Sequence, residues 1–142
     1  MAVTSESFGL LMHLTAHDWR TALDRRLRPL GLSRATWLLL AIVSRSEGLS
    51  QSELASRLGL EGASVVRLVD RLEREGLVER HTGEDRRVKT IHLRDKGAGV
   101  AAEIRKVAAA LRADVFRGIR ASELEAAAAV LAKLKARLGA VQ

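Results

Sequence analysis

Apolar residues recur every three or four positions from about Ser7 to Leu30, which is the period of one face of an α-helix. The stripe consists of Phe8, Leu11, Thr15, Trp19, Leu23, Leu27 and Leu30. It ends at Gly31, a residue suited to the left-handed turn that closes a helix. A second helix is predicted after Ser33, which can cap it, and it ends at Ser46-Glu47-Gly48.

Residues 50–75 carry the pattern of two short helices joined by a tight turn. The Ser-Gln-Ser-Glu run at 50–53 is a capping box, in which the Ser50 hydroxyl accepts from the Glu53 amide and the Glu53 carboxylate reaches back to the Ser50 amide. Gly59 ends this helix, and a second helix is predicted over 61–75. This arrangement is the helix-turn-helix pattern, whose second helix enters the major groove of duplex DNA.

The second of these helices has an apolar face and a basic face. Val65, Leu68, Val69 and Leu72 point one way, and Ser64, Arg67, Arg71 and Arg74 line another side. We expect the apolar face to pack on the domain and the basic face to meet DNA. An arginine paired with guanine O6 and N7 gives about 1–3 kcal/mol of base discrimination, whereas a phosphate contact gives position only. Ser64 and Arg67 lie nearest the start of the helix, so they are the expected base contacts.

After Gly76 the period of the apolar pattern changes to two, which indicates β-strands. Strands are predicted over 77–80 and 88–93, joined by residues 81–87, as a β-hairpin wing. Asp85 near its tip can hold one guanidinium in place while the other reaches the minor groove, whose negative potential attracts arginine. The pattern leaves open which of Arg86 and Arg87 enters that groove.

From Asp95 onward the apolar pattern is helical again, with stripes over 100–115 and 127–138. Together with the first helix, these segments have more apolar surface than a small winged lobe can cover, so we expect an intersubunit bundle. The predicted fold is mainly α. A winged helix-turn-helix lobe of three helices plus a β-hairpin occupies 31–94, and a helical dimerisation region comprises 1–30 and 95–142.

The composition favours a polyanionic partner. Lys and Arg outnumber Asp and Glu by 24 to 17, a formal net charge of +7, which attracts nucleic acid first and an anionic membrane surface second. Within residues 50–94 the excess is only nine to eight, so the placement of the arginines, rather than net charge, predicts the site. An aromatic content of 3% disfavours single-strand and RNA binding, which rely on stacking of bases on aromatic rings.

Other function classes find little support. No run of 18 or more uncharged apolar residues occurs, so we expect a cytoplasmic protein without a membrane partner. No catalytic motif or phosphate-binding glycine loop is present, and there is no cysteine, so no enzyme activity, cofactor or metal is expected. His13 and His17 have a spacing that can chelate zinc, but only Asp18 is an obvious acidic neighbour, and ordinary helix histidines are the simpler interpretation.

The residues also resemble the multiple-antibiotic-resistance regulator (MarR) family, and within it the SlyA-like branch, from Phe8 to Leu138. The resemblance is carried by the segments 49–55 (LSQSELA), 66–73 (VRLVDRLE), 76–78 (GLV) and 85–89 (DRRVK), and also by Trp19-Arg20 and the run 26–32 leading to Trp37. The Asp-Arg-Arg wing at this distance after the second helix is far more specific than a generic helix-turn-helix.

The resemblance implies a triangular homodimer that binds a roughly palindromic double-stranded DNA site, as a repressor or counter-silencer. The implied DNA-binding residues are Ser50, Gln51, Ser64, Arg67, Arg71, Arg86 and Arg87. Family members often bind small anionic aromatics such as salicylate between the dimer bundle and the DNA lobe, and then lose DNA affinity. The residues expected to line that effector site here are His13, His17, Trp37 and Arg80.

Other interpretations of these residues and of the whole chain follow from the same sequence. Arg71 and Arg74 suit a solvated helix face beside Asp70 and Glu75, and Trp37 suits a core position. The chain also fits a non-specific architectural protein that binds phosphates alone, which would show a steep salt dependence with little sequence preference. A dimerisation or ligand-sensing module without DNA binding is disfavoured by Arg67 and the Arg86-Arg87 pair.

Overall fold

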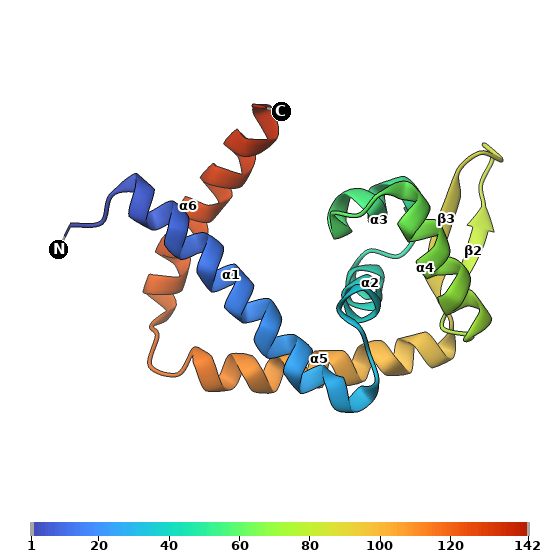
Figure 1. Ribbon diagram of the computed structural model, residues 1–142, viewed down its shortest axis with the longest axis horizontal. Coiled ribbons are helices and arrows are strands. Elements are labelled where there is room, and N and C mark those ends of the chain that lie inside the picture. Colours follow the sequence, from blue (N-terminus) through green and yellow to red (C-terminus); the bar gives the residue numbers. More distant parts are fainter. Residues whose placement is uncertain (1, 142) are drawn as a thin grey trace. The chain divides into compact units, whose positions relative to one another are not determined.

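Several helices begin or end at residues suited to capping. A computed structural model describes residues 2–141 and gives, in order, α1 (Ser5–Leu27), a 3-10 turn η1 (Arg28–Leu30), α2 (Arg34–Arg45), β1 (Leu49–Ser50), α3 (Gln51–Leu58), α4 (Gly62–Arg74), β2 (Val78–Thr82), β3 (Lys89–Leu93), α5 (Asp95–Val115) and α6 (Ala121–Ala140) (Figure 1). Ser33 caps α2, and Gly31 and Gly59 adopt left-handed conformations with φ of 73° and 67°. These features confirm the predicted mainly helical, winged helix-turn-helix fold.

The first helix ends at Leu27, before the end at Leu30 that the apolar stripe predicts. Helix α1 stops at Leu27, and residues Arg28–Leu30 form the tighter turn η1 before Gly31. Pro29 is the physical reason, because it has no amide hydrogen to continue the α-helical ladder. The helix also starts earlier than predicted, at Ser5, because Thr4 and Ser7 cap it reciprocally.

The wing belongs to a three-stranded antiparallel sheet in the order β1-β3-β2. Strands β2 and β3 pair with Val78 opposite Leu93 and Thr82 opposite Lys89, and β1 adds Leu49 opposite Ile91. The sequence pattern missed β1, because two residues are too short to display an alternation. Half of the predicted capping box at 50–53 is present: the Ser50 hydroxyl accepts from the Glu53 amide at 3.1 Å. Among the described residues, the Glu53 carboxylate does not accept from the Ser50 amide.

A single hydrophobic core supports the winged lobe and the helices beside it. The four residues of the predicted apolar face of α4 are all buried, together with Leu39, Leu40, Leu54, Val78 and Ile91. The end of α1 and the first five turns of α5 also contribute Leu23, Leu27, Ile104 and Leu111 to this core. The described chain forms one compact unit up to Leu111 and a second from Arg112 onward.

The second unit is almost entirely exposed within one chain. No residue of α6 is buried, although Val130, Leu131 and Leu138 are large apolar side chains. The first half of α1, in the other unit, likewise exposes Leu10, Leu11 and Leu14. Among residues 2–141, none of the helices combines the length and the apolar character that crossing a bilayer requires.

Candidate nucleic-acid interface

Helix α4 presents the predicted basic face beside an open groove. The groove has a volume of about 410 Å³ and is lined by Ser33, Ala35, Leu60, Ser64, Arg67, Leu68, Arg71 and Arg74. All charged residues in this lining are arginines. The Arg67 Nη2 donates to the Ser64 hydroxyl at 3.3 Å, one helical turn earlier, so the two expected base-contacting residues lie together near the start of α4.

The Arg71 side chain on α4 bonds to a residue of α2. Its Nη2 donates to the Thr36 hydroxyl at 2.7 Å, and Thr36 is a buried residue of α2. Its Nε lies 3.9 Å from a carboxylate oxygen of Glu75, one helical turn later on the same helix. Arg71 therefore joins α4 to α2, while about half of its side chain remains accessible at the groove.

The wing tip combines one oriented arginine with a cationic hollow. Asp85 accepts from the Arg87 amide at 3.0 Å and from the Arg87 Nε at 3.2 Å, and these bonds hold the pKa of the Asp85 carboxyl below its usual value. The Arg87 side chain is nevertheless 91% exposed. Arg86 instead lines a hollow of about 510 Å³ with Thr82, Gly83 and Lys89. Asp85 thus holds Arg87, not Arg86.

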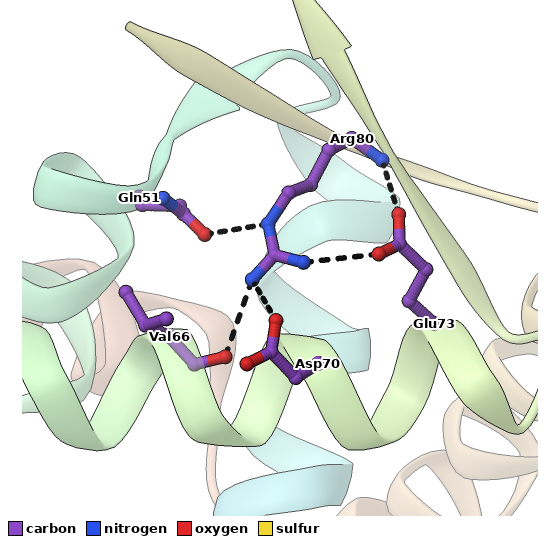
Figure 2. Close-up of polar contacts among 5 residues, drawn as sticks. All are labelled: Gln51, Val66, Asp70, Glu73 and Arg80. Atoms are coloured by element: carbon purple, nitrogen blue, oxygen red, sulfur yellow. Dashed lines mark hydrogen bonds and ion pairs between the residues drawn. The ribbon is translucent and has the colours of Figure 1, made fainter. Parts of the chain in front are cut away.

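Arg80 connects the base of the wing to the helix-turn-helix (Figure 2). Its Nε donates to the Gln51 side-chain oxygen at 2.8 Å, and its Nη1 donates to Glu73 at 3.0 Å. The Nη2 lies 2.7 Å from an oxygen of Asp70 and 3.2 Å from the carbonyl oxygen of Val66. The Arg80 amide also donates to Glu73, at 3.2 Å.

The remaining predicted DNA contacts lie at the start of α3. Ser50 caps that helix through the Glu53 amide, and Gln51 is engaged by Arg80. Sequence reasoning missed the roles of Asp70, Glu73 and Lys89. The alternation of the hairpin could have found Lys89, because it is directly opposite Thr82; the acceptors of Arg80 required knowledge of which face of α4 meets the wing.

The four residues expected to bind an effector are not brought together by any contact among the described residues. His13 and His17 are exposed on α1. Trp37 is 5% exposed, and its indole N–H donates to Asp24 at 2.7 Å. Asp24 also accepts from Arg34, which lowers the pKa of the Asp24 carboxyl and ties α1 to α2. Neither of the two cavities described above is lined by any of the four residues.

The described residues lack the cluster of ligands that a metal site requires. Among residues 2–141, no group of three or more His, Cys, Asp or Glu side chains is arranged to hold an ion. The wing does bring His81 and His92 into a stack with ring centroids 3.9 Å apart.

Comparison with known proteins agrees with this geometry. A family model described as "MarR family" matches residues 30–88, the stretch from the end of η1 to the wing. The crystal structure of transcriptional regulator PA3341 is 44% identical with a TM-score of 0.86, and the match covers 93% of this chain and 98% of that one. A MarR-family regulator from Silicibacter pomeroyi is 28% identical with a TM-score of 0.80, over 96% and 92% of the two chains.

Two further structures bear on finer points. CouR from Rhodococcus jostii RHA1, solved bound to p-coumaroyl-CoA, is 25% identical with a TM-score of 0.77, over 94% of this chain and 95% of that one. SlyA is 20% identical, a likeness of the fold alone, so the SlyA-like branch stays a prediction. High identity over nearly the whole length, together with the matching family model, establishes that the chain belongs to the MarR family of DNA-binding transcriptional regulators.

Proposed function

We propose that the protein binds a palindromic double-stranded DNA site as a homodimer and discriminates among sequences through α4. The observation that carries this proposal is the groove beside α4, in which every charged lining residue is an arginine. The wing of the same lobe adds a second cationic hollow at its tip. A helix of this kind inserts into the major groove, and a hairpin beside it reaches the adjacent minor groove.

The roles of the arginines follow from how they are held. Ser64 and Arg67 lie at the start of α4, so they are assigned to base edges, and Arg71 and Arg74 to positioning on phosphates. At the wing, Arg87 is assigned to the minor groove because Asp85 orients its guanidinium while leaving it exposed. Arg86 and Lys89 then face phosphates from the hollow at the tip.

Dimerisation is supported by apolar surface that one chain leaves uncovered. Leucines of the first half of α1 and apolar residues of α6 are exposed over successive helical turns. Monomeric proteins rarely expose contiguous apolar patches of this kind, and a second copy of the chain is the partner that a palindromic site requires. Sedimentation of the purified protein at working concentrations tests this, since a monomer would contradict the proposal.

The decisive experiment selects preferred sites from a random duplex pool and then compares variants on the selected operator. We expect Arg67→Ala to weaken the specific site by about 1–3 kcal/mol and to relax base preference, and Arg87→Ala to weaken binding more uniformly across sequences. Arg105→Gln on α5 is the matched control, because it removes the same charge from an exposed site outside this surface. Unchanged operator binding by both Arg67→Ala and Arg87→Ala would refute the assignment.

The same experiment separates regulation from non-specific architecture. A regulator should favour its operator over random duplex by about 10³-fold or more, whereas a phosphate-only binder shows a steep salt slope without that preference. Absence of any selected sequence would therefore identify an architectural protein.

We further propose that the protein acts as a repressor or counter-silencer and that a small aromatic acid controls its binding to DNA. Such control is supported by CouR, which was solved bound to p-coumaroyl-CoA. Salicylate and related acids are expected to raise the operator Kd. Insensitivity to a broad panel of such acids would point to an effector-independent regulator.

A further inference from the structure

Arg80 lies between the two elements that the proposed function assigns to DNA. It belongs to β2, the strand that leads to the wing tip, and its guanidinium points toward α4 (Figure 2). Its acceptors on α4 are Val66, Asp70 and Glu73, which are four and three residues apart and therefore share one face over two turns. One side chain thus contacts three residues along that face of α4.

This set of bonds requires the fork of a guanidinium. Nε, Nη1 and Nη2 each reach a different acceptor, and the acceptors come from α3 as well as α4. A lysine ammonium carries the same charge but is a single point, so it cannot span Gln51, Glu73 and Asp70 together. The contact therefore fixes an orientation in addition to supplying attraction.

The contact is also protected from solvent to a degree that the wing tip is not. The Arg80 side chain is only 18% exposed, while Asp70 and Glu73 remain about half exposed. Ion pairs that are partly withdrawn from water are screened less by salt than surface pairs. The base of the wing is thus bonded to α4 by a side chain with little exposure, whereas Arg87 at its tip is 91% exposed.

We propose that Arg80 is a positioning residue for DNA binding: it sets the wing against α4, so that Arg87 meets the duplex in the register that Arg67 determines. This inference rests on the proposed function for Arg67 and Arg87. It assigns to Arg80 no contact with DNA.

The first test needs no DNA. Because the sequence has no cysteine, the exposed pair Ala63→Cys and Glu84→Cys places one nitroxide label on α4 and one at the wing tip. Mixing the labelled protein with an excess of unlabelled protein suppresses the distances between labels on different copies of the chain. We expect a single narrow distance distribution, which broadens when Arg80→Gln or Arg80→Lys is added. An unchanged width in Arg80→Gln overturns the inference, whatever the protein does with DNA.

The second test measures whether the contribution of Arg87 depends on Arg80. On the selected operator, Arg87→Ala is expected to weaken wild-type binding about 10-fold, but the Arg80→Gln protein less than about 3-fold. The cost of Arg67→Ala should be the same in both backgrounds. A merely structural role of Arg80, or a purely electrostatic one, predicts instead that Arg87→Ala costs the same factor in both.

Two further variants keep the test decisive. Arg80→Lys preserves the charge and is expected to show the same loss of coupling as Arg80→Gln; full recovery by lysine would overturn the proposal in favour of charge alone. Arg105→Gln should leave the Arg87→Ala cost at its wild-type value. If the wild type selects no operator, the proposed function fails, whereas additive costs on a selected operator overturn only the role of Arg80.

Discussion

The base and the tip of the β2–β3 hairpin both pair an arginine with carboxylate, but in opposite surroundings. At the base, Arg80 is mostly withdrawn from solvent and bonds to two other elements of the lobe. At the tip, Arg87 is almost fully exposed and bonds to Asp85, two residues earlier in the same turn. The attraction between opposite charges is weak in water and grows as water is excluded.

An arginine–carboxylate pair has a different effect at each end of the hairpin. A long-range pair with little exposure joins elements, because breaking it leaves polar groups without partners. A local pair at an exposed turn adds little to stability, but it orients a cation that remains available to another molecule. The two ends of the hairpin should therefore respond differently to substitution, and three experiments can test that difference.

The largest effect is expected where the base of the hairpin meets α5. A Cβ added at Gly97 would lie 1.9 Å from the carbonyl oxygen of Leu77, which already accepts from the Arg94 amide at 2.9 Å. Because backbone must move to relieve this overlap, we expect Gly97→Ala to lower the free energy of unfolding by about 3 kcal/mol, measured by urea denaturation at fixed protein concentration.

A control for this variant lies on the same helix. A Cβ added at Gly99 meets nothing within 4 Å, so Gly99→Ala should stabilise the protein by about 0.5–1 kcal/mol through helix propensity. Equal stabilities of the two variants would show that the close approach of α5 to Leu77 is not a constraint at the base.

An intermediate effect is expected from neutralising one carboxylate at each end. Glu73 accepts from both the amide and the guanidinium of Arg80, so Glu73→Gln should lower the free energy of unfolding by about 0.5–1 kcal/mol. Asp85→Asn, at the tip, should leave the urea midpoint unchanged within error. On the selected operator we expect the opposite order: Asp85→Asn should weaken binding more than Glu73→Gln, because it releases the Arg87 guanidinium. A greater loss of stability from Asp85→Asn than from Glu73→Gln would refute this distinction between the two ends.

The smallest effect is a shift in a proton equilibrium at the tip. The bonds from Arg87 lower the pKa of Asp85 in the folded protein relative to the unfolded chain. The ion pair therefore contributes stability above the unfolded pKa, which is lost as pH falls through the folded pKa, below about pH 4. Carboxyl NMR should find the Asp85 pKa below its usual value and closer to it in Arg87→Ala; an identical titration in both proteins would contradict the pairing.

Much of the fold was accessible from local patterns. Helix caps such as Ser33, turn glycines such as Gly59 and the four apolar residues of α4 act over one or two turns, so the sequence displays them directly. The basic face of α4 and the cationic tip follow from the same short-range periodicities. The short strand β1 and the early stop of α1 were missed because two residues show no period, and because the effect of Pro29 was outweighed by the apolar stripe.

Local patterns in the sequence set the order of the helices and of the two wing strands, the buried face of α4 and the positions of positive charge, because each depends on neighbours within a few positions. Three sets of contacts emerge only from the folded chain: Arg80 bonds to Gln51, Asp70 and Glu73, Asp85 bonds to Arg87, and Trp37 bonds to Asp24 in the core. These pairings depend on which faces meet after the chain has closed on itself, and no local period records that choice.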